Sequence, residues 1–119
     1  MKTHRRTWLL SLAGMALASH PLHALAQEAV VKIAHVAPVT GPIAYLGKDN
    51  KNGSRLAVED LNANGLITGG KKARFELPAE DDGADPRCAV EVANKLVTAK
   101  VAAVIGHLNS GANIPASRI

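Results

Sequence analysis

Cysteine and aromatic residues are nearly absent from this sequence of 119 residues. The single cysteine, Cys88, excludes an internal disulfide, and no group of Cys and His has the spacing of a zinc site. One Trp, one Tyr and one Phe are too few for the stacking platforms that bind nucleic-acid bases. No apolar run is long enough to span a bilayer. These absences exclude a structural zinc site, a nucleic-acid partner and a membrane span.

The positive charge is concentrated at the start of the chain. The formal net charge is +4, and Lys2, Arg5 and Arg6 contribute three of the positive charges. Without them, 11 Lys and Arg face 10 Asp and Glu. The remaining chain is therefore nearly neutral and lacks the basic stripe of a nucleic-acid-binding domain.

Residues 1–26 have the pattern of a secretory signal peptide. The three early charges precede an apolar stretch at 8–18, and Ala24-Leu25-Ala26 supplies the small-x-small cleavage pattern. We expect cleavage before Gln27, export to the periplasm, and no stable membrane insertion of the mature chain. The Arg5-Arg6 pair leaves a twin-arginine route open, but a bare pair is common and we favour the general secretory route.

Three segments of the mature chain are predicted to be strands. Residues 30–36 and 101–105 are almost continuously apolar, which is typical of parallel strands covered on both faces. Residues 73–80 alternate between apolar and polar, as in a half-buried strand. Pro78 cannot donate to a ladder, so this strand should lie at a sheet edge or end early.

The segments between the strands are predicted to be helices. The first covers about 47–64 and ends at Gly65, which tolerates the left-handed conformation. Its apolar side is expected to consist of Leu56, Ala57, Leu61 and Ala63. The second begins at Asp85-Pro86, a strong helix start, and runs to about Ala99, with Cys88 packed as a free thiol in its first turn. A third begins near the end of the chain, with Pro115 in about its first turn.

This order of elements predicts the opening β-α-β-α-β part of a doubly wound, parallel α/β sheet. If the first strand lies between the other two, the crevice beyond the carboxyl ends of the first and third strands is the expected ligand site. The loops at 38–47 and 106–113 follow those two strands. Three strands form too narrow a sheet for a closed domain, so we expect residues 27–119 to be incomplete.

Ser110 is the most informative polar residue at that crevice. A hydroxyl at the start of a helix, beside free amide groups, is suited to binding an anion, although a plain N-cap is the alternative. A serine nucleophile elbow requires glycines where Leu108 and Ala112 stand. Gly106 and Gly111 are not followed by the Lys and Ser or Thr of a phosphate loop. The sequence therefore indicates no cofactor and favours binding over catalysis.

The other polar candidates have simpler explanations. His107 could be a base or a ligand contact, but such residues are more often hydrogen-bonded histidines at a strand end, and His35 rates lower. Asp81, Asp82 and Asp85 lack the spaced carboxylates of a calcium loop. We interpret these aspartates as a solvated turn and a helix cap, and expect no metal site.

Several short stretches match one protein family in order and spacing, and they cover nearly all of 28–119. They are Thr40-Gly41-Pro42 with Gly47, Asn52-Gly53, residues 57–62 with Gly65, Asp81-Asp82 with Asp85-Pro86, residues 93–97, and residues 104–110 with Pro115-Ala116-Ser117. The sequence resembles the N-terminal part of the leucine/isoleucine/valine-binding protein family. Members are periplasmic receptors of branched-chain amino acid ABC importers.

The resemblance implies a two-lobed fold of the periplasmic binding protein type I, of which 27–119 would begin the first lobe. It also implies capture of amino acids, especially aliphatic ones, and delivery to ABC-transporter permease subunits, with no enzymatic step. Three alternatives stay open: a hydrolase that uses Ser110, a sensor domain of the same fold that acts on a signalling partner, and an inactive truncated product.

The resemblance also assigns candidate ligand contacts. Ser110 matches the serine that binds the ligand α-carboxylate, and Asn109 and Gly111 flank it. Some members carry an aromatic residue directly before a glycine of the first loop. Leu46 holds that place here and Tyr45 precedes it, so both are candidates to contact the ligand side chain.

Overall fold

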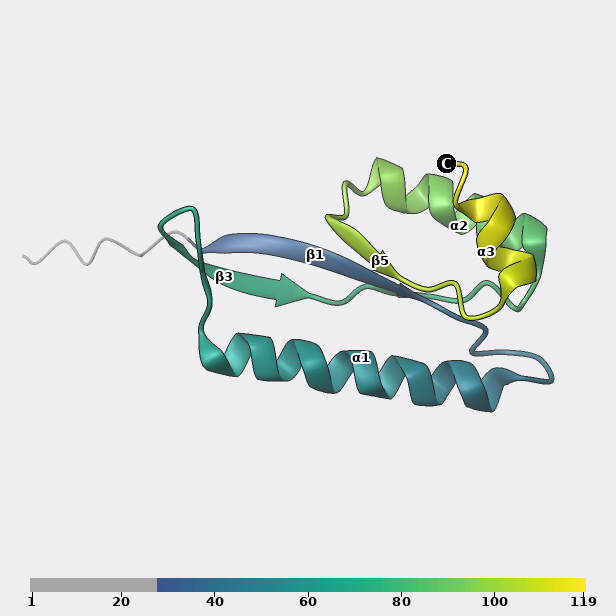
Figure 1. Ribbon diagram of the computed structural model, residues 1–119, viewed down its shortest axis with the longest axis horizontal. Helices are drawn as coiled ribbons and strands as arrows, with labels where there is room; N and C mark the ends of the chain where they lie inside the picture. The colour runs from purple at the N-terminus through teal and green to yellow at the C-terminus, as the bar shows by residue number, and fades with distance from the viewer. Residues whose placement is uncertain (1–27) are drawn as a thin grey trace, which may run out of the picture.

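The computed structural model describes residues 28–119 as one mixed α/β unit (Figure 1). The predicted signal peptide, 1–26, lies outside these residues. The elements are β1 (Ala29–Val36), α1 (Ala44–Asn64), β2 (Ile67–Thr68), β3 (Lys71–Glu76), β4 (Ala79–Glu80), α2 (Pro86–Thr98), β5 (Ala103–Ile105) and α3 (Ser110–Ala116). Within this part of the chain, no helix combines the length and apolar character needed to cross a membrane.

The sheet is built around β1, as predicted. β1 pairs in parallel with β3 and then β4 along one edge, and with β5 along the other. Helix α1 covers one face of the sheet, and α2 and α3 cover the other (Figure 1). The short strand β2 pairs antiparallel with the start of β3, a hairpin that the sequence analysis missed.

Proline splits the predicted strand 73–80 in two. β3 ends at Glu76 and β4 resumes at Ala79, so the strand ends early as expected. Pro78 has no N–H to donate, but its carbonyl accepts a hydrogen bond of 2.8 Å from the amide of His35 in β1. The sheet therefore continues past the break.

Helix α1 packs through a different side from the predicted one. It begins at Ala44 and buries Gly47, Ser54 and Val58, whereas Leu56 is 55% exposed. A side chain at Gly47 would lie 2.0 Å from the carbonyl oxygen of Pro38, so the helix can approach the preceding loop only with glycine there. Small residues, rather than the leucine, therefore decide which side faces the sheet. The helix ends at Gly65 in the left-handed conformation, as predicted.

Asn62 attaches α1 to the edge of β3. Its amide nitrogen donates to the carbonyl of Phe75 at 2.9 Å, and its oxygen accepts from the amide of Phe75 at 2.8 Å. One side chain thus satisfies both backbone groups of a strand residue.

Helix α2 starts as predicted and packs on both the sheet and α3. Asp85 accepts hydrogen bonds from the amides of Arg87 and Cys88, at 2.7 and 3.1 Å. Leu96 packs on Ala34 and Val36 of β1. The contact with α3 consists of small residues, which allow the two helices to lie close: Ala89, Ala93, Ala112 and Ala116.

Three further expectations are wrong. Cys88 is exposed, not packed, because it lies on the outer side of the first turn of α2. Pro115 lies in the second turn of α3, since the helix begins at Ser110. β5 is parallel to β1 as predicted, but it is not buried, since Val104 and Ile105 are 43% and 38% exposed among the described residues.

Candidate functional site

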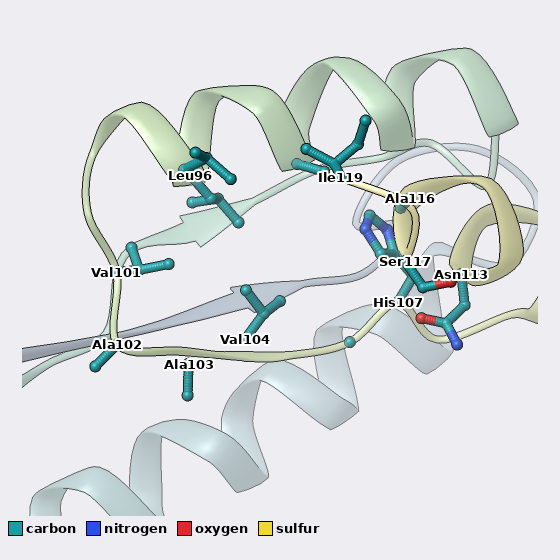
Figure 2. Close-up of a pocket in the computed structure, with 13 residues that line it drawn as sticks. Leu96, Val101, Ala102, Ala103, Val104, His107, Asn113, Ala116, Ser117 and Ile119 are labelled. Atoms are coloured by element: carbon teal, nitrogen blue, oxygen red, sulfur yellow. The ribbon is translucent and has the colours of Figure 1, made fainter.

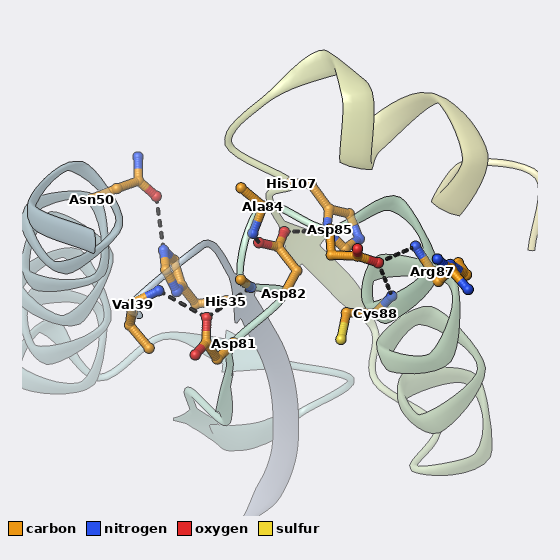
Figure 3. Close-up of polar contacts among 11 residues, drawn as sticks. His35, Val39, Asn50, Asp81, Asp82, Ala84, Asp85, Arg87, Cys88 and His107 are labelled. Atoms are coloured by element: carbon orange, nitrogen blue, oxygen red, sulfur yellow. Dashed lines mark hydrogen bonds and ion pairs between the residues drawn. The ribbon is translucent and has the colours of Figure 1, made fainter. Parts of the chain in front are cut away.

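Three loops meet at the carboxyl end of the sheet. They follow β1, β4 and β5, at 37–43, 81–85 and 106–109. Figure 3 shows that the two neighbouring aspartates of the middle loop contact the loops on either side. The predicted crevice of a doubly wound fold lies at this end.

Asp81 holds the loop after β1. Its carboxylate accepts hydrogen bonds from the amide of Val39 at 2.9 Å, the hydroxyl of Thr40 at 2.6 Å and the amide of Gly83 at 2.9 Å. Burial by itself would raise the pKa of Asp81, but the hydrogen bonds, led by that of Thr40, outweigh it and hold the pKa below its ordinary value.

Asp82 holds the loop after β5. Its Oδ2 lies 2.7 Å from Nδ1 of His107, with the two side chains 0% and 5% exposed. Its Oδ1 accepts from the amide of Ala84 at 2.9 Å. The interpretation of Asp82 as part of a solvated turn is therefore wrong, because folding places it against a residue 25 positions away. His107 is a hydrogen-bonded histidine at a strand end, as favoured.

His35 is a buried histidine on the α1 side of β1. Its Nε2 lies 2.8 Å from Oδ1 of Asn50, which connects the strand to α1. Its Nδ1 has no hydrogen-bond partner within residues 28–119. The fully buried position supports a packing role for this residue.

Asn109, Ser110 and Gly111 lie together at the start of α3. Asn109, in an extended conformation, occupies the N-cap position, and its carbonyl accepts from the amides of Ala112 and Asn113. The cap interpretation of Ser110 is therefore wrong, since Ser110 is the first helical residue and is exposed. The side chain of Asn109 makes no cap hydrogen bond, and its buried Oδ1 has no partner in the described part of the chain.

Tyr45 and Leu46 lie elsewhere at the same end of the molecule. Both are in the first turn of α1, where they are 67% and 45% exposed. Tyr45 and Leu46 belong to α1 and Ser110 belongs to α3, and these two helices cover opposite faces of the sheet (Figure 1). Their contact with a ligand stays a prediction.

A separate apolar groove of about 330 Å³ runs between α2, β5 and α3 (Figure 2). Leu96, Val101, Val104 and Ile119 are among its lining residues, and His107 also borders it. The ligand contacts that the resemblance assigns do not line it: Tyr45, Leu46, Asn109, Ser110 and Gly111. Across residues 28–119, no three His, Cys, Asp or Glu side chains are grouped to hold a metal ion.

Comparison with known proteins decides the family. The sequence model of the periplasmic binding protein family matches residues 30–118. The chain belongs to this family. The relatives that match this chain are named as substrate-binding proteins, and not as enzymes.

Two curated relatives illustrate the kinship of this periplasmic binding protein. The leucine-specific-binding protein of Salmonella typhimurium is 39% identical over 119 residues, which is 100% of this chain and 30% of the relative. The Leu/Ile/Val-binding protein of Escherichia coli K12 is 41% identical over 108 residues, 91% of this chain and 28% of the relative. The chain thus spans about 30% of the length of such relatives.

A solved structure shows the same architecture. The branched-chain amino acid transporter substrate-binding protein of Streptococcus pneumoniae, in complex with isoleucine, superposes with a TM-score of 0.66 and 34% identity. The match covers 74% of this chain and 25% of that protein. The fold is therefore that of the type I periplasmic binding proteins, as predicted.

Proposed function

We propose that this protein captures amino acids with aliphatic side chains in the periplasm and delivers them to the permease subunits of an ABC importer. The relatives named for leucine, isoleucine and valine support this ligand class. Their ligands share an α-carboxylate, an α-ammonium group and a branched apolar side chain. The site needs to bind these three groups and to carry out no chemical step.

We infer that residues 27–119 form the beginning of the first lobe. The exposed strand β5 and the groove beside it support this view, because an apolar parallel strand is normally covered on both faces. In a two-lobed protein, further chain would cover this groove and the second lobe would close over the ligand.

The observation that carries the proposal is the position of Ser110. Ser110 is an exposed residue after the last strand and is the first residue of α3, not its cap. The preceding loop is held by the buried Asp82–His107 pair. The hydroxyl and the first amides of α3 are thus free to bind a carboxylate. Asn109 and Gly111 would border the carboxylate, and Tyr45 and Leu46 would approach the ligand from the other side of the crevice.

The test uses a hybrid protein, in which residues 27–119 replace the matching segment of the E. coli Leu/Ile/Val-binding protein. Calorimetry measures the dissociation constants of leucine and leucinamide, which lacks the carboxylate. Replacing Ser110 with Ala removes a charge-assisted hydrogen bond worth about 1.5–3 kcal/mol. The leucine dissociation constant should therefore rise about 10- to 150-fold, with little change for leucinamide.

Ser117→Ala is the matched control. Ser117 is an exposed serine at the other end of α3 and donates only to the carbonyl of Ile114. This variant should bind leucine like the parent hybrid. Unchanged leucine affinity in Ser110→Ala would end the assignment of Ser110.

Export is a separate part of the proposal. The charged start, the apolar stretch and Ala24-Leu25-Ala26 support cleavage before Gln27. Intact-mass measurement of exported material should give a chain beginning at Gln27, and a product that retains Met1 would contradict the proposal.

A further inference from the structure

We propose that the buried pair Asp82–His107 positions the carboxylate-binding loop, and that both residues control ligand affinity without touching the ligand. The inference rests on the proposed function of Ser110. Asp82 and His107 would be positioning residues, and the carboxylate would be bound by Ser110 and its neighbouring amides.

Asp82 is fixed by its own loop before it meets His107. Its Oδ1 accepts from the amide of Ala84 at 2.9 Å, and its carbonyl accepts from the amide of Asp85 at 2.8 Å, next to the start of α2. The remaining oxygen, Oδ2, is directed at Nδ1 of His107 (Figure 3). An ionised carboxylate only accepts hydrogen bonds, so the imidazole ring is the donor.

His107 is close enough to the ligand loop to fix its position. On its amino-terminal side, Gly106 lies against the end of β1, where a side chain would meet the carbonyl oxygen of Val36 at 2.1 Å. On its other side, the carbonyl of Asn109 accepts the first hydrogen bonds of α3. Gly106 is held by its close approach to Val36, and His107 is held by its contact with Asp82. The two residues between His107 and Ser110 therefore have little conformational freedom.

Burial makes this link difficult to replace. The pair is almost entirely removed from water. Deleting one partner of a buried pair destabilises the fold more than deleting one partner of an exposed pair, because the remaining polar group stays buried without a hydrogen bond. The loop would then shift to let solvent reach the unpaired group. Such a shift would move Ser110 away from the carboxylate.

The neighbouring aspartates provide a matched pair of variants. Within residues 28–119, the hydrogen bonds of the Asp81 carboxylate go to the loop after β1 and to its own turn, through Val39, Thr40 and Gly83. Asp82→Ala should therefore disturb the Ser110 loop, whereas Asp81→Ala should disturb the opposite loop.

The experiment measures two quantities in the hybrid protein. One is the hydrogen exchange of amides 106–110 without ligand. The other is the carboxylate preference, the dissociation constant of leucinamide divided by that of leucine, which is insensitive to a uniform loss of folded protein. In His107→Leu and Asp82→Ala, exchange should accelerate and the preference should fall about 10-fold, a typical effect of removing a supporting residue. Asp81→Ala should leave both quantities unchanged.

His107→Asn tests whether the donor itself matters. The asparagine amide nitrogen can occupy the place of Nδ1, so this variant should regain most of the carboxylate preference, and thermal melting confirms that each variant is folded. If the hybrid binds leucine and His107→Leu keeps the parental preference, the positioning role is overturned while the proposed function stands. If the hybrid binds no leucine, the proposed function fails. Hydrogen exchange still tests the positioning role in that case, and unchanged exchange of amides 106–110 in Asp82→Ala would overturn it.

Discussion

The carboxyl end of this sheet and its lateral edge at β5 differ in how many contacts the described residues make there. At the carboxyl end, Asp81 holds the loop after β1 and Asp82 holds the loop after β5 through short polar contacts, and the Asp82–His107 pair is buried. Along the outer edge of β5, apolar residues such as Val104 and Ile105 remain exposed beside the groove.

The difference indicates which properties residues 28–119 can supply by themselves. At the polar end, Asp81 and Asp82 find hydrogen-bond partners in the loops on either side, and so the arrangement of these loops is set within residues 28–119. The apolar edge has no such partners in the described chain, and so stability depends on covering it. Four predictions test this contrast.

The largest effect should come from separating residues 27–119 from any covering segment. We expect the isolated segment to self-associate and to show no measurable leucine binding, because the apolar residues of β5 are exposed and the proposed function places the rest of the ligand cleft outside this segment. Light scattering with size-exclusion chromatography and calorimetry would measure both properties. A monomer with a cooperative melt, raised in temperature by leucine, would contradict the prediction.

The next largest effect should come from Gly106→Ala in the hybrid. The new methyl group would meet the carbonyl of Val36 at 2.1 Å, and a φ of +140° is unfavourable for alanine. We expect the free energy of unfolding to fall by at least about 2 kcal/mol. Gly53→Ala is the control: Gly53 lies inside α1 with nothing within 4 Å, so this variant should gain about 0.5–1 kcal/mol. Equal effects in denaturant unfolding would refute the argument.

Asn62→Ala should have an intermediate effect. It removes both hydrogen bonds to the backbone of Phe75 and leaves those groups without their partner. We expect a loss of about 1–3 kcal/mol in the free energy of unfolding. Asn64→Ala, at the exposed last position of α1, should change stability by no more than about 0.5 kcal/mol. A loss for Asn62→Ala no larger than for this control would show that the contact with Phe75 is unimportant.

The smallest effect concerns acid. The hydrogen bonds from Thr40, Gly83 and Val39 hold the pKa of Asp81 below its ordinary value of 3.8, so its ionised form favours the folded state. This stabilisation is present above about pH 4 and is lost as the pH falls through the folded-state pKa. Between pH 5 and pH 3, the hybrid should lose more stability than its Asp81→Asn variant. Equal losses in the two proteins would mean that Asp81 does not contribute.

Local sequence signals predicted much of the fold. The parallel order of strands follows from their composition and spacing, and Asp85-Pro86 and Gly65 mark helix ends through their own backbone chemistry. The hairpin at β2 is too short for any periodicity to be visible. The prediction of which side of α1 packs on the sheet was wrong. Close approach of the helix to Pro38 requires a glycine at position 47, and a pattern of apolar residues gives no information about such a requirement.

The candidate site was predictable only in part. Asn109, Ser110 and Gly111 could be placed because the end of a strand and the start of a helix bracket them. The Asp82–His107 contact joins residues 25 positions apart, and no local pattern signals it. The exposure of β5 was missed because its apolar composition is typical of a covered strand, whereas Val104 and Ile105 are 43% and 38% exposed among the described residues.

A crystal structure of the hybrid with bound leucine tests the central claim most directly. The account predicts that the ligand α-carboxylate accepts hydrogen bonds from the Ser110 hydroxyl and the first amides of α3, with donor–acceptor distances of about 2.7–3.1 Å. It also predicts that His107 and Asp82 remain paired behind the loop. A carboxylate bound elsewhere, or leucine seated in the apolar groove beside β5, would contradict the account.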